Sequence, residues 1–297
     1  MNLVDITTAF PTEDRCRELL VRLRWPEGPH CPRCKMDAVE LETEKRLFYC
    51  KDCDYQFTVT AGTIFNDSHL PLTTWFMATM LLCEAKKGMS ACQIQRTLGI
   101  GSYKTAWYLC HRIRHAMIES QRPMLDGKVE MDETYVGGRN WRKGKGSLHE
   151  NKEIVIGIRQ RGGELRFFHA ADAKSGTLEK YIRENISEDV DVLFTDDANA
   201  YKGAAKHLRK DRRHKTIRHK LQVYVKGDIY TNTVESAFSL LKRGIIGSWH
   251  RVSAKHLQAY CTEMAFRFNR RKNSDLFIDT LRHMVTATTL TFEKLTA

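Results

Sequence analysis

The sequence predicts a multidomain α/β protein, in which small N-terminal modules precede a larger domain built on a mixed β-sheet. Three observations lead to this prediction. Two close cysteine pairs lie near the N-terminus, a segment with helical apolar periodicity follows them, and from about residue 128 the pattern changes to strands with intervening helices. At 297 residues the chain is long enough for several such parts.

Composition restricts the partners that the chain can have. It contains 48 Lys and Arg against 36 Asp and Glu, a net charge of +12. Such an excess favours a polyanionic partner, nucleic acid before an anionic membrane. The longest apolar stretch, residues 75–85, is too short to span a bilayer. The N-terminus has no basic region followed by an apolar segment, so we expect a cytoplasmic protein with no membrane contact.

The first module, residues 1–28, is expected to be an N-terminal helix. Apolar residues recur at helical spacing between residues 11 and 25, and Pro26 and Gly28 then end the pattern.

Residues 29–70 carry a specific metal-ligand motif. Its cysteines follow the pattern C-x2-C, fifteen residues, C-x2-C, and are Cys31, Cys34, Cys50 and Cys53. Two tight turns of this kind offer four thiolates to one Zn²⁺. The segment has little apolar mass, so the metal would contribute most of its folding free energy. A redox dithiol and unrelated cysteines are the alternatives; we expect a zinc ribbon with one structural Zn²⁺ per chain.

Residues 71–122 have the pattern of several helices, and the last two have the spacing of a helix-turn-helix. Gly99 to Gly101 would form the turn. The second helix, residues 103–117, would then enter the major groove of DNA. The residues of this helix that we expect to contact DNA are Lys104, Arg112 and Arg114. An ordinary helical pair with a solvated basic face is the alternative.

Strands and helices alternate from residue 123 to residue 272. We expect a strand at about 128–136, a hairpin around Gly162 and Gly163, a helix, and an apolar strand that ends on Asp196. Further helices should follow, which indicates an α/β domain with a mixed sheet. The tail, 273–297, is expected to be helical.

Three acidic residues in this domain suggest a metal site. Asp132 lies on the first strand, Asp196 ends a later strand, and Glu235 lies near the start of a helix. Neighbouring strands would bring the first two to one edge. Three carboxylates at one point repel one another strongly without cations, and Mg²⁺ suits such oxygen donors. Two Mg²⁺ ions there would support an in-line phosphodiester displacement.

Each acid also has a purely structural explanation. Asp132 fits an exposed turn, Asp196 fits a helix cap, and Glu235 fits the acid of a capping box. A strongly basic segment, 202–220, lies between the second and third acids and favours the interpretation as a site. It supplies two further candidate DNA contacts, Arg212 and Arg213.

Three segments of the chain resemble a known family: "MDETYVGG", "FTDDANAY" and "TNTVESAFSLLKRGIIGSWHRVSAKHLQAYCTEMAFRFNRR". They look like bacterial insertion-sequence transposases of the DDE type, and more narrowly the group with an N-terminal zinc ribbon. The resemblance covers about residues 10–272. It implies a ribonuclease H-like catalytic domain and maps the family's acids onto Asp132, Asp196 and Glu235. Lys242 matches a basic position after the last acid, although a solvated surface lysine has the same spacing.

The resemblance implies transposition. The protein would cut double-stranded DNA at the terminal inverted repeats of an insertion sequence and transfer the 3′-ends into target DNA, as a homo-oligomer that is at least a dimer. A DNA-binding regulator without catalysis and a Mg²⁺-dependent nuclease that cuts without joining are the alternatives. A zinc-dependent hydrolase is weaker, since four cysteines leave no open position on the metal. Glu133 and Asp197, beside two of the acids, leave open which carboxylate of each pair is the ligand.

Overall fold

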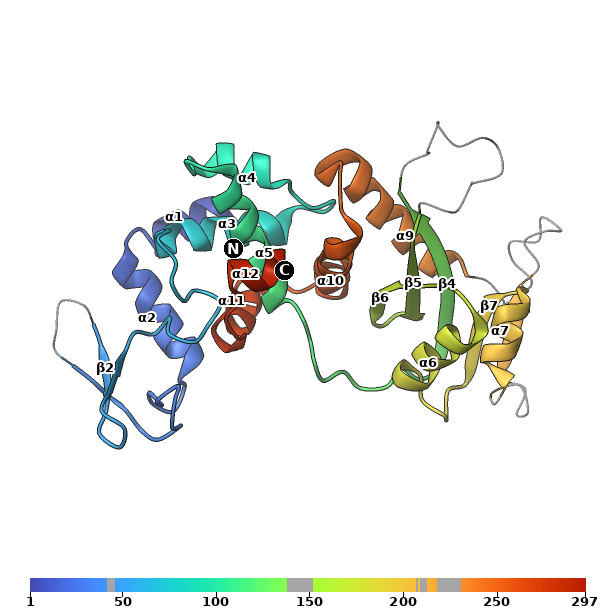
Figure 1. Ribbon diagram of the computed structural model, residues 1–297, viewed down its shortest axis with the longest axis horizontal. Coiled ribbons are helices and arrows are strands. Elements are labelled where there is room, and N and C mark those ends of the chain that lie inside the picture. Colours follow the sequence, from blue (N-terminus) through green and yellow to red (C-terminus); the bar gives the residue numbers. More distant parts are fainter. Residues whose placement is uncertain (42–45, 138–151, 207, 209–212, 218–230) are drawn as a thin grey trace. The chain divides into compact units, whose positions relative to one another are not determined.

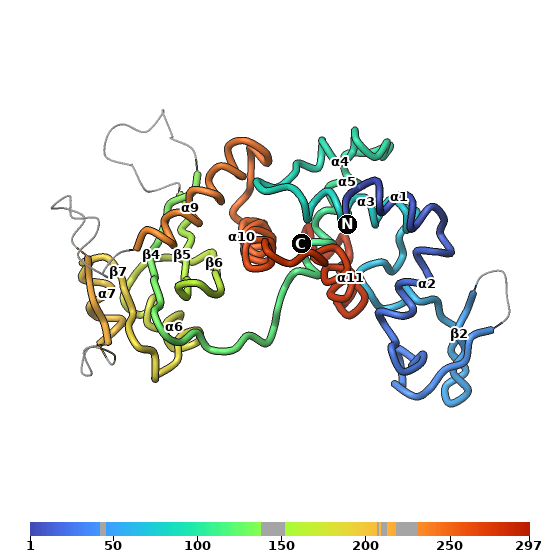
Figure 2. The backbone as a smooth tube through the Cα atoms, turned by 180° about the vertical axis from the view of Figure 1, so that it is seen from behind, coloured from blue at the N-terminus to red at the C-terminus, as the bar shows by residue number. Residues whose placement is uncertain are grey.

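The computed structural model describes residues 1–41, 46–137, 152–206, 208, 213–217 and 231–297. They form two compact units, one from Met1–Ile118 with Arg270–Ala297 and the other from Glu119–Asn269. Figure 1 shows both units, and Figure 2 shows them from the opposite side. Within the described ranges, no helix is both long enough and apolar enough to cross a membrane.

The N-terminal unit is mainly helical and contains one small sheet. Its elements are α1 Leu3–Ala9, α2 Glu13–Arg24, β1 Val39–Glu40, β2 Phe48–Cys50, β3 Tyr55–Phe57, α3 Leu72–Glu84, α4 Ala91–Leu98, α5 Tyr103–Ala116, α11 Leu276–Thr286 and α12 Phe292–Thr296. The three strands form the antiparallel sheet β1-β2-β3, the ribbon-like module that the cysteine spacing predicts. Its core consists of the packed rings of Trp25, Phe48 and Phe57, which is little apolar mass for a folded module.

The predicted turn between the last two helices of residues 71–122 is present. Gly99 ends α4 with φ 65°, in the left-handed region that favours glycine. The hydroxyl of Ser90 caps the start of α4 by accepting from the backbone N–H of Gln93 at 3.1 Å. Helix α5 follows after Gly101 and Ser102, and its buried face includes Ala106, Leu109 and Ile113.

The C-terminal unit contains a five-stranded mixed sheet. Its elements are β4 Lys128–Val136, β5 Glu153–Gln160, β6 Leu165–Ala170, α6 Ser175–Asn185, β7 Val192–Asp196, α7 Asn199–Ala204, β8 His214–Ile217, α9 Asn232–Gly244, the π-helical turn η2 Ile245–Trp249 and α10 Ala254–Asn269. The strand order is β6-β5-β4-β7-β8; the first three strands are antiparallel, and β7 and β8 run parallel to β4. This confirms the predicted mixed sheet. Strand β8, in the basic segment, was not expected.

Helices cover both faces of this sheet (Figure 1). Helices α6 and α7 pack on one face, through a core that includes Met131 and Leu193. Helices α9 and α10 pack on the other face, through a core that includes Val155 and Phe167. Successive side chains of a strand point to opposite faces. Because Met131 faces α6 and α7, Asp132 faces the layer that contains α9.

A glycine lets α9 approach the sheet beside Asp132. Gly157 of β5 is the residue paired with Asp132 of β4. A Cβ atom on Gly157 would lie 2.7 Å from the ring of Phe238 and 2.8 Å from the side chain of Val234, both on α9. Only glycine therefore permits this close packing.

The replacement Gly157→Ala should lower the free energy of unfolding by roughly 1–3 kcal/mol, because the added methyl group overpacks the interface with α9. Gly176→Ala is a matched control, since nothing lies within 4 Å of a Cβ atom at Gly176 of α6; it should change the value by no more than about 0.5 kcal/mol. Urea denaturation measures both. Equal stability of the two variants would contradict the close packing at Gly157.

Candidate active site and zinc centre

The sheet places Asp132 and Asp196 on adjacent parallel strands. Glu130 of β4 pairs with Phe194 of β7, and two residues further along the strands lie Asp132 and Asp196. The sequence-based expectation that these two strands are neighbours is confirmed. The Oδ1 atom of Asp196 accepts a hydrogen bond from the backbone N–H of Ala198 at 3.0 Å. Ala198 is itself the N-cap residue of α7, and no side chain caps that helix, so the helix-cap alternative for Asp196 is not realised.

Glu235 lies in the first turn of α9, the helix that packs over this part of the sheet. Its Oε1 atom accepts a hydrogen bond from the hydroxyl of Thr231 at 2.8 Å. Thr231 is also the N-cap residue of α9, and no side-chain capping hydrogen bond is formed there. The capping-box alternative for Glu235 is therefore not realised.

The carboxylates act on one another electrostatically. Burial, followed by the negative charges of Glu133, Asp196 and Glu235, raises the pKa of Asp132 to about 8. The structure thus places Asp196 and Glu235 within electrostatic range of Asp132, all in a single unit. A bound divalent cation would reverse the shift, because it favours the ionised carboxylate.

The cysteines, and not the acids, form a compact ligand group in the metal-free structure. Among the described residues, the one group of three or more possible ligands close enough to hold a metal ion is the four cysteines, whose donor atoms all lie within 4.8 Å of one another. In sites with two metals the ions lie about 3.5–4 Å apart, and different carboxylates bind each ion. Hard oxygen donors of this kind suit Mg²⁺.

The two neighbouring acids have partners of their own. Asp197 Oδ1 lies 2.9 Å from the ammonium group of Lys202 and accepts a 3.4 Å hydrogen bond from the hydroxyl of Thr216. Glu133 accepts a 2.6 Å hydrogen bond from the buried hydroxyl of Tyr201. Burial, with the charges of Glu133 and Asp132, raises the pKa of Tyr201 well above its ordinary value, so Tyr201 stays a neutral donor. These contacts favour Asp132 and Asp196 as the pair that is available to metal.

The zinc ribbon brings its four cysteines together. Sγ of Cys31 lies 3.6 Å from Sγ of Cys53, and Sγ of Cys34 lies 3.4 Å from Sγ of Cys50, and none is in a disulfide. Four thiolates at this spacing fit the tetrahedral coordination of Zn²⁺ and leave no open position. This donor set therefore fits a structural zinc site and not a catalytic one.

Local backbone geometry prepares the metal ligands. Lys35 and Asp54, each directly after the second cysteine of a pair, have φ of 67° and 52° and make the two tight turns. Burial raises the pKa of the Cys31 thiol, but hydrogen bonds from the backbone N–H groups of Cys34 and Arg33 and with the thiols of Cys53 and Cys34 together lower it to about 6. A lowered pKa favours the thiolate, the form of Cys31 that binds zinc.

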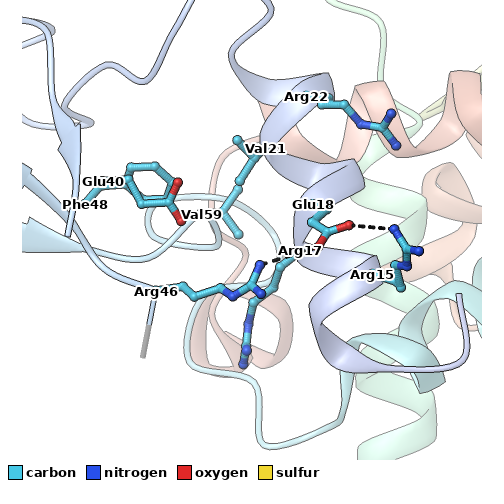
Figure 3. Close-up of a pocket in the computed structure, with 9 residues that line it drawn as sticks. All are labelled: Arg15, Arg17, Glu18, Val21, Arg22, Glu40, Arg46, Phe48 and Val59. Carbon is cyan, nitrogen blue, oxygen red and sulfur yellow. Dashed lines mark hydrogen bonds and ion pairs between the residues drawn. The ribbon is translucent and has the colours of Figure 1, made fainter. Parts of the chain in front are cut away.

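A separate cavity of about 340 Å³ lies in the N-terminal unit, between α2 and the ribbon (Figure 3). It is lined by Arg15, Arg17, Glu18, Val21, Arg22, Glu40, Arg46, Phe48 and Val59. Arg15 and Arg46 form ion pairs with Glu18 at 3.2 and 3.6 Å, and Arg17 pairs with Asp14 at 3.2 Å. These acids offset much of the positive charge of the cavity.

The structure separates the predicted DNA contacts on α5. Lys104 is exposed in the first turn and lies 4.2 Å from the ring centroid of Phe292. Arg112 and Arg114 in the last turns are only 3% and 1% exposed. Arg112 donates to the carbonyl of Asn66. The burial of the two arginines therefore conflicts with the prediction that they contact DNA. In the last turns of α5 these basic side chains lie in the core and not at the surface.

The remaining predicted DNA contacts lie in the C-terminal unit. Lys242 is exposed on α9, seven residues after Glu235 and thus on the same side of the helix. Arg213 is partly exposed, donates to the carbonyl of Glu188 at 2.5 Å and lies 3.6 Å from Asp189. Arg212 lies outside the described residues, as do residues 207, 209–211 and 218–220 of the basic segment.

Sequence reasoning missed Glu130, a fully buried acid two residues before Asp132 on the same face of β4. It also missed Thr231, whose hydroxyl orients the carboxylate of Glu235. One signal in the sequence could have identified Glu130: it is a second acid, two residues from Asp132, on a strand of which one face is buried.

The replacement Cys31→Ser should remove the bound zinc, one Zn²⁺ per chain, and unfold the ribbon, since the metal contributes most of its folding free energy. Native mass spectrometry counts the zinc, and limited proteolysis reports on the ribbon. Cys92→Ser, at an exposed cysteine outside the cluster, should keep the ion. Retention of a folded, zinc-loaded ribbon by Cys31→Ser would contradict the assignment.

The replacement Asp132→Asn should stabilise the protein when Mg²⁺ is absent. The folded-state pKa of about 8 lies above the ordinary value of 3.8, so folded Asp132 retains a proton that the unfolded chain has lost. Parent stability therefore falls as the pH rises from about 4 to 8, whereas the asparagine variant is spared this loss. Allowing for partial solvent access, we expect a gain of about 1–3 kcal/mol at pH 8.

Urea denaturation in Mg²⁺-free buffer from pH 5 to pH 9 measures this difference. The advantage of Asp132→Asn should widen up to pH 8 and then level off. A variant that is less stable than the parent protein throughout this range would show that Asp132 is not under electrostatic strain.

Comparison with known proteins agrees with both parts of the structure. Residues 124–269 match the family model of the ISXO2-like transposase domain, and residues 11–56 match that of the transposase zinc-ribbon domain. The chain is 31% identical over 277 residues to an uncharacterized protein in transposable element ISH50 of Halobacterium salinarum, covering 87% of this chain and 91% of that protein. No solved structure gives a significant match. The chain therefore belongs to the ISXO2-like family of DDE transposases that carry an N-terminal zinc ribbon.

Proposed function

We propose that the protein cuts at the terminal inverted repeats of an insertion sequence and joins the freed 3′-ends to target DNA, acting in the cytoplasm. One observation carries this proposal. Adjacent parallel strands hold Asp132 and Asp196, and α9 brings Glu235 within electrostatic range of Asp132. A site of this composition serves phosphoryl transfer in a protein whose net charge of +12 favours DNA.

We assign the binding of two Mg²⁺ ions to Asp132, Asp196 and Glu235. When bound, the ions would activate the attacking hydroxyl and stabilise the leaving oxygen of an in-line displacement. Asp132 must lose its proton first, since its pKa is raised to about 8 in the metal-free protein. Thr231 orients Glu235 by donating to its Oε1 atom. Water can attack in the cutting step and a DNA 3′-hydroxyl in the joining step at the same acids, so no side-chain nucleophile is needed.

We further propose that the C-terminal unit has the ribonuclease H-like fold that the family resemblance implies. A five-stranded mixed sheet with helices on both faces supports this assignment. The proposed domains are 1–28, 29–70, 71–122, 123–272 and 273–297. The limits of the compact unit Glu119–Asn269 lie within a few residues of the proposed catalytic domain.

DNA binding is assigned to two exposed regions, each considered within its own unit. In the proposed helix-turn-helix, the accessible part of α5 is its first turn, with Tyr103 51% exposed and Lys104 beside it. This is the end from which recognition helices contact base edges. Lys242 on α9 would contact phosphate near Glu235, and Arg213 is a further candidate. Because two element ends must be joined, we propose at least a dimer on DNA.

A strand-transfer assay with purified full-length protein tests the function. The substrates are labelled duplexes that carry the terminal repeats flanking the gene, a supercoiled plasmid target, and Mg²⁺. The variants Asp132→Ala, Asp196→Ala and Glu235→Ala should each lose cutting and joining by about 10³-fold or more, since several kcal/mol of transition-state stabilisation depend on the metal ligands.

Asp197→Asn is the matched control, because Asp197 already forms an ion pair with Lys202. The activity of this variant should stay within about tenfold of that of the parent protein, a difference of about 1.4 kcal/mol. Products of cutting without joining would identify a nuclease instead. Specific binding to the ends with no cutting by the parent protein would identify a regulator. Either result would overturn the proposal.

A further inference from the structure

A fully buried carboxylate connects β4 to the start of α9. Glu130 has 0% exposure. Its Oε2 atom accepts hydrogen bonds from the backbone N–H and the hydroxyl of Thr233, at 3.0 and 2.7 Å, and from the backbone N–H of Val234 at 3.1 Å. Its Oε1 atom accepts from Nε of Arg161 at 2.6 Å. A buried carboxylate needs such partners to be stable, so these groups form one linked network.

In this network Glu130 replaces a local cap of α9. The first N–H groups of a helix have no partner within the helix, and the N-cap residue Thr231 supplies no side-chain capping hydrogen bond. Glu130 binds the N–H groups of the second and third helical residues from a different element. Its negative charge also lies at the positive end of the helix dipole. The start of α9 is thereby attached to β4.

Two arginines extend the network to the other strands of the site. The guanidinium group of Arg161, which directly follows β5, lies 4.1 Å from the ring centroid of Phe194 on β7. Arg159 of β5 donates to the backbone carbonyl of Thr233 at 2.7 Å. Glu130 of β4 and Arg159 of β5 therefore contact the first turn of α9 directly, and Phe194 of β7 joins the network through Arg161.

Three members of the network lie two residues before the three proposed acids in the sequence. Glu130, Phe194 and Thr233 each precede one of the acids by two residues. On a strand, residues two apart lie on the same face, so Glu130 and Phe194 form the layer next to Asp132 and Asp196. In α9, the capped residues lead directly to Glu235.

We propose that Glu130 is a positioning residue that sets the distance of Glu235 from Asp132 and Asp196. This inference rests on the proposed metal-dependent function. Glu130 does not touch the ions; it fixes the helix that carries one ligand relative to the strands that carry the other two. Replacing an outer-shell residue that orients metal ligands typically changes metal affinity or activity by about 10–100-fold.

The test is Glu130→Gln in the full-length protein, with Mn²⁺ binding measured by electron paramagnetic resonance. Mn²⁺ accepts the same oxygen ligands as Mg²⁺. Glutamine keeps the shape but loses the ion pair with Arg161, so Mn²⁺ should bind about 10–100-fold more weakly. The Mg²⁺ concentration for half-maximal cutting should rise in parallel, and hydrogen–deuterium exchange should accelerate at residues 231–236.

Glu263→Gln is the matched control for loss of a buried ion pair. Glu263 of α10 is also 0% exposed and lies 2.9 Å from Arg267 of the same helix. It should lose stability without a change in Mn²⁺ affinity. Thr233→Val provides a milder test, because it removes only the hydroxyl donor to Glu130. It should weaken Mn²⁺ binding by a smaller factor, and it carries the test if Glu130→Gln does not fold.

The outcomes separate this inference from the proposed function. Parent-like Mn²⁺ affinity in both Glu130→Gln and Thr233→Val, with lower stability as in Glu263→Gln, would overturn the positioning role alone. A parent protein that binds no Mn²⁺ at a site sensitive to Asp132→Asn would overturn the metal-dependent function and this inference together.

Discussion

The burial of Asp132 among other carboxylates is the constraint that the packing of the C-terminal unit must offset. In the metal-free protein, burial and the surrounding negative charges raise the pKa of Asp132 to about 8, so holding these groups together costs free energy. Packing elsewhere offsets that cost: adjacent parallel strands, a glycine that admits α9, and a buried glutamate that caps it. In the proposed function the same carboxylates bind metal at the expense of stability, as active-site groups commonly do.

Much of this arrangement could be predicted because it has short-range signatures. The cysteine spacing predicted the ribbon, since metal ligands must sit on tight turns at fixed separations. Apolar alternation ending on acids predicted β4 and β7, and the mixed sheet made them candidates for neighbours. The family resemblance, carried by the segments around Asp132, Asp196 and Glu235, was confirmed by the family models.

Other features depend on tertiary context that no local pattern records. The buried end of α5 has the same basic composition as an exposed recognition surface, and only packing shows that Arg112 and Arg114 face inward. Strand β8 is short and rich in polar residues, and pairs through its backbone. The contact between Glu130 and the start of α9 joins positions about a hundred residues apart. Such contacts are decided by the register of the sheet, which the sequence of one strand does not specify.

Anomalous X-ray scattering from crystals soaked in Mn²⁺ tests the central claim most directly, because it locates ions relative to named side chains. Two peaks are expected in direct contact with the carboxylates of Asp132, Asp196 and Glu235. Well-ordered crystals with these side chains in place and no peak between them would contradict it.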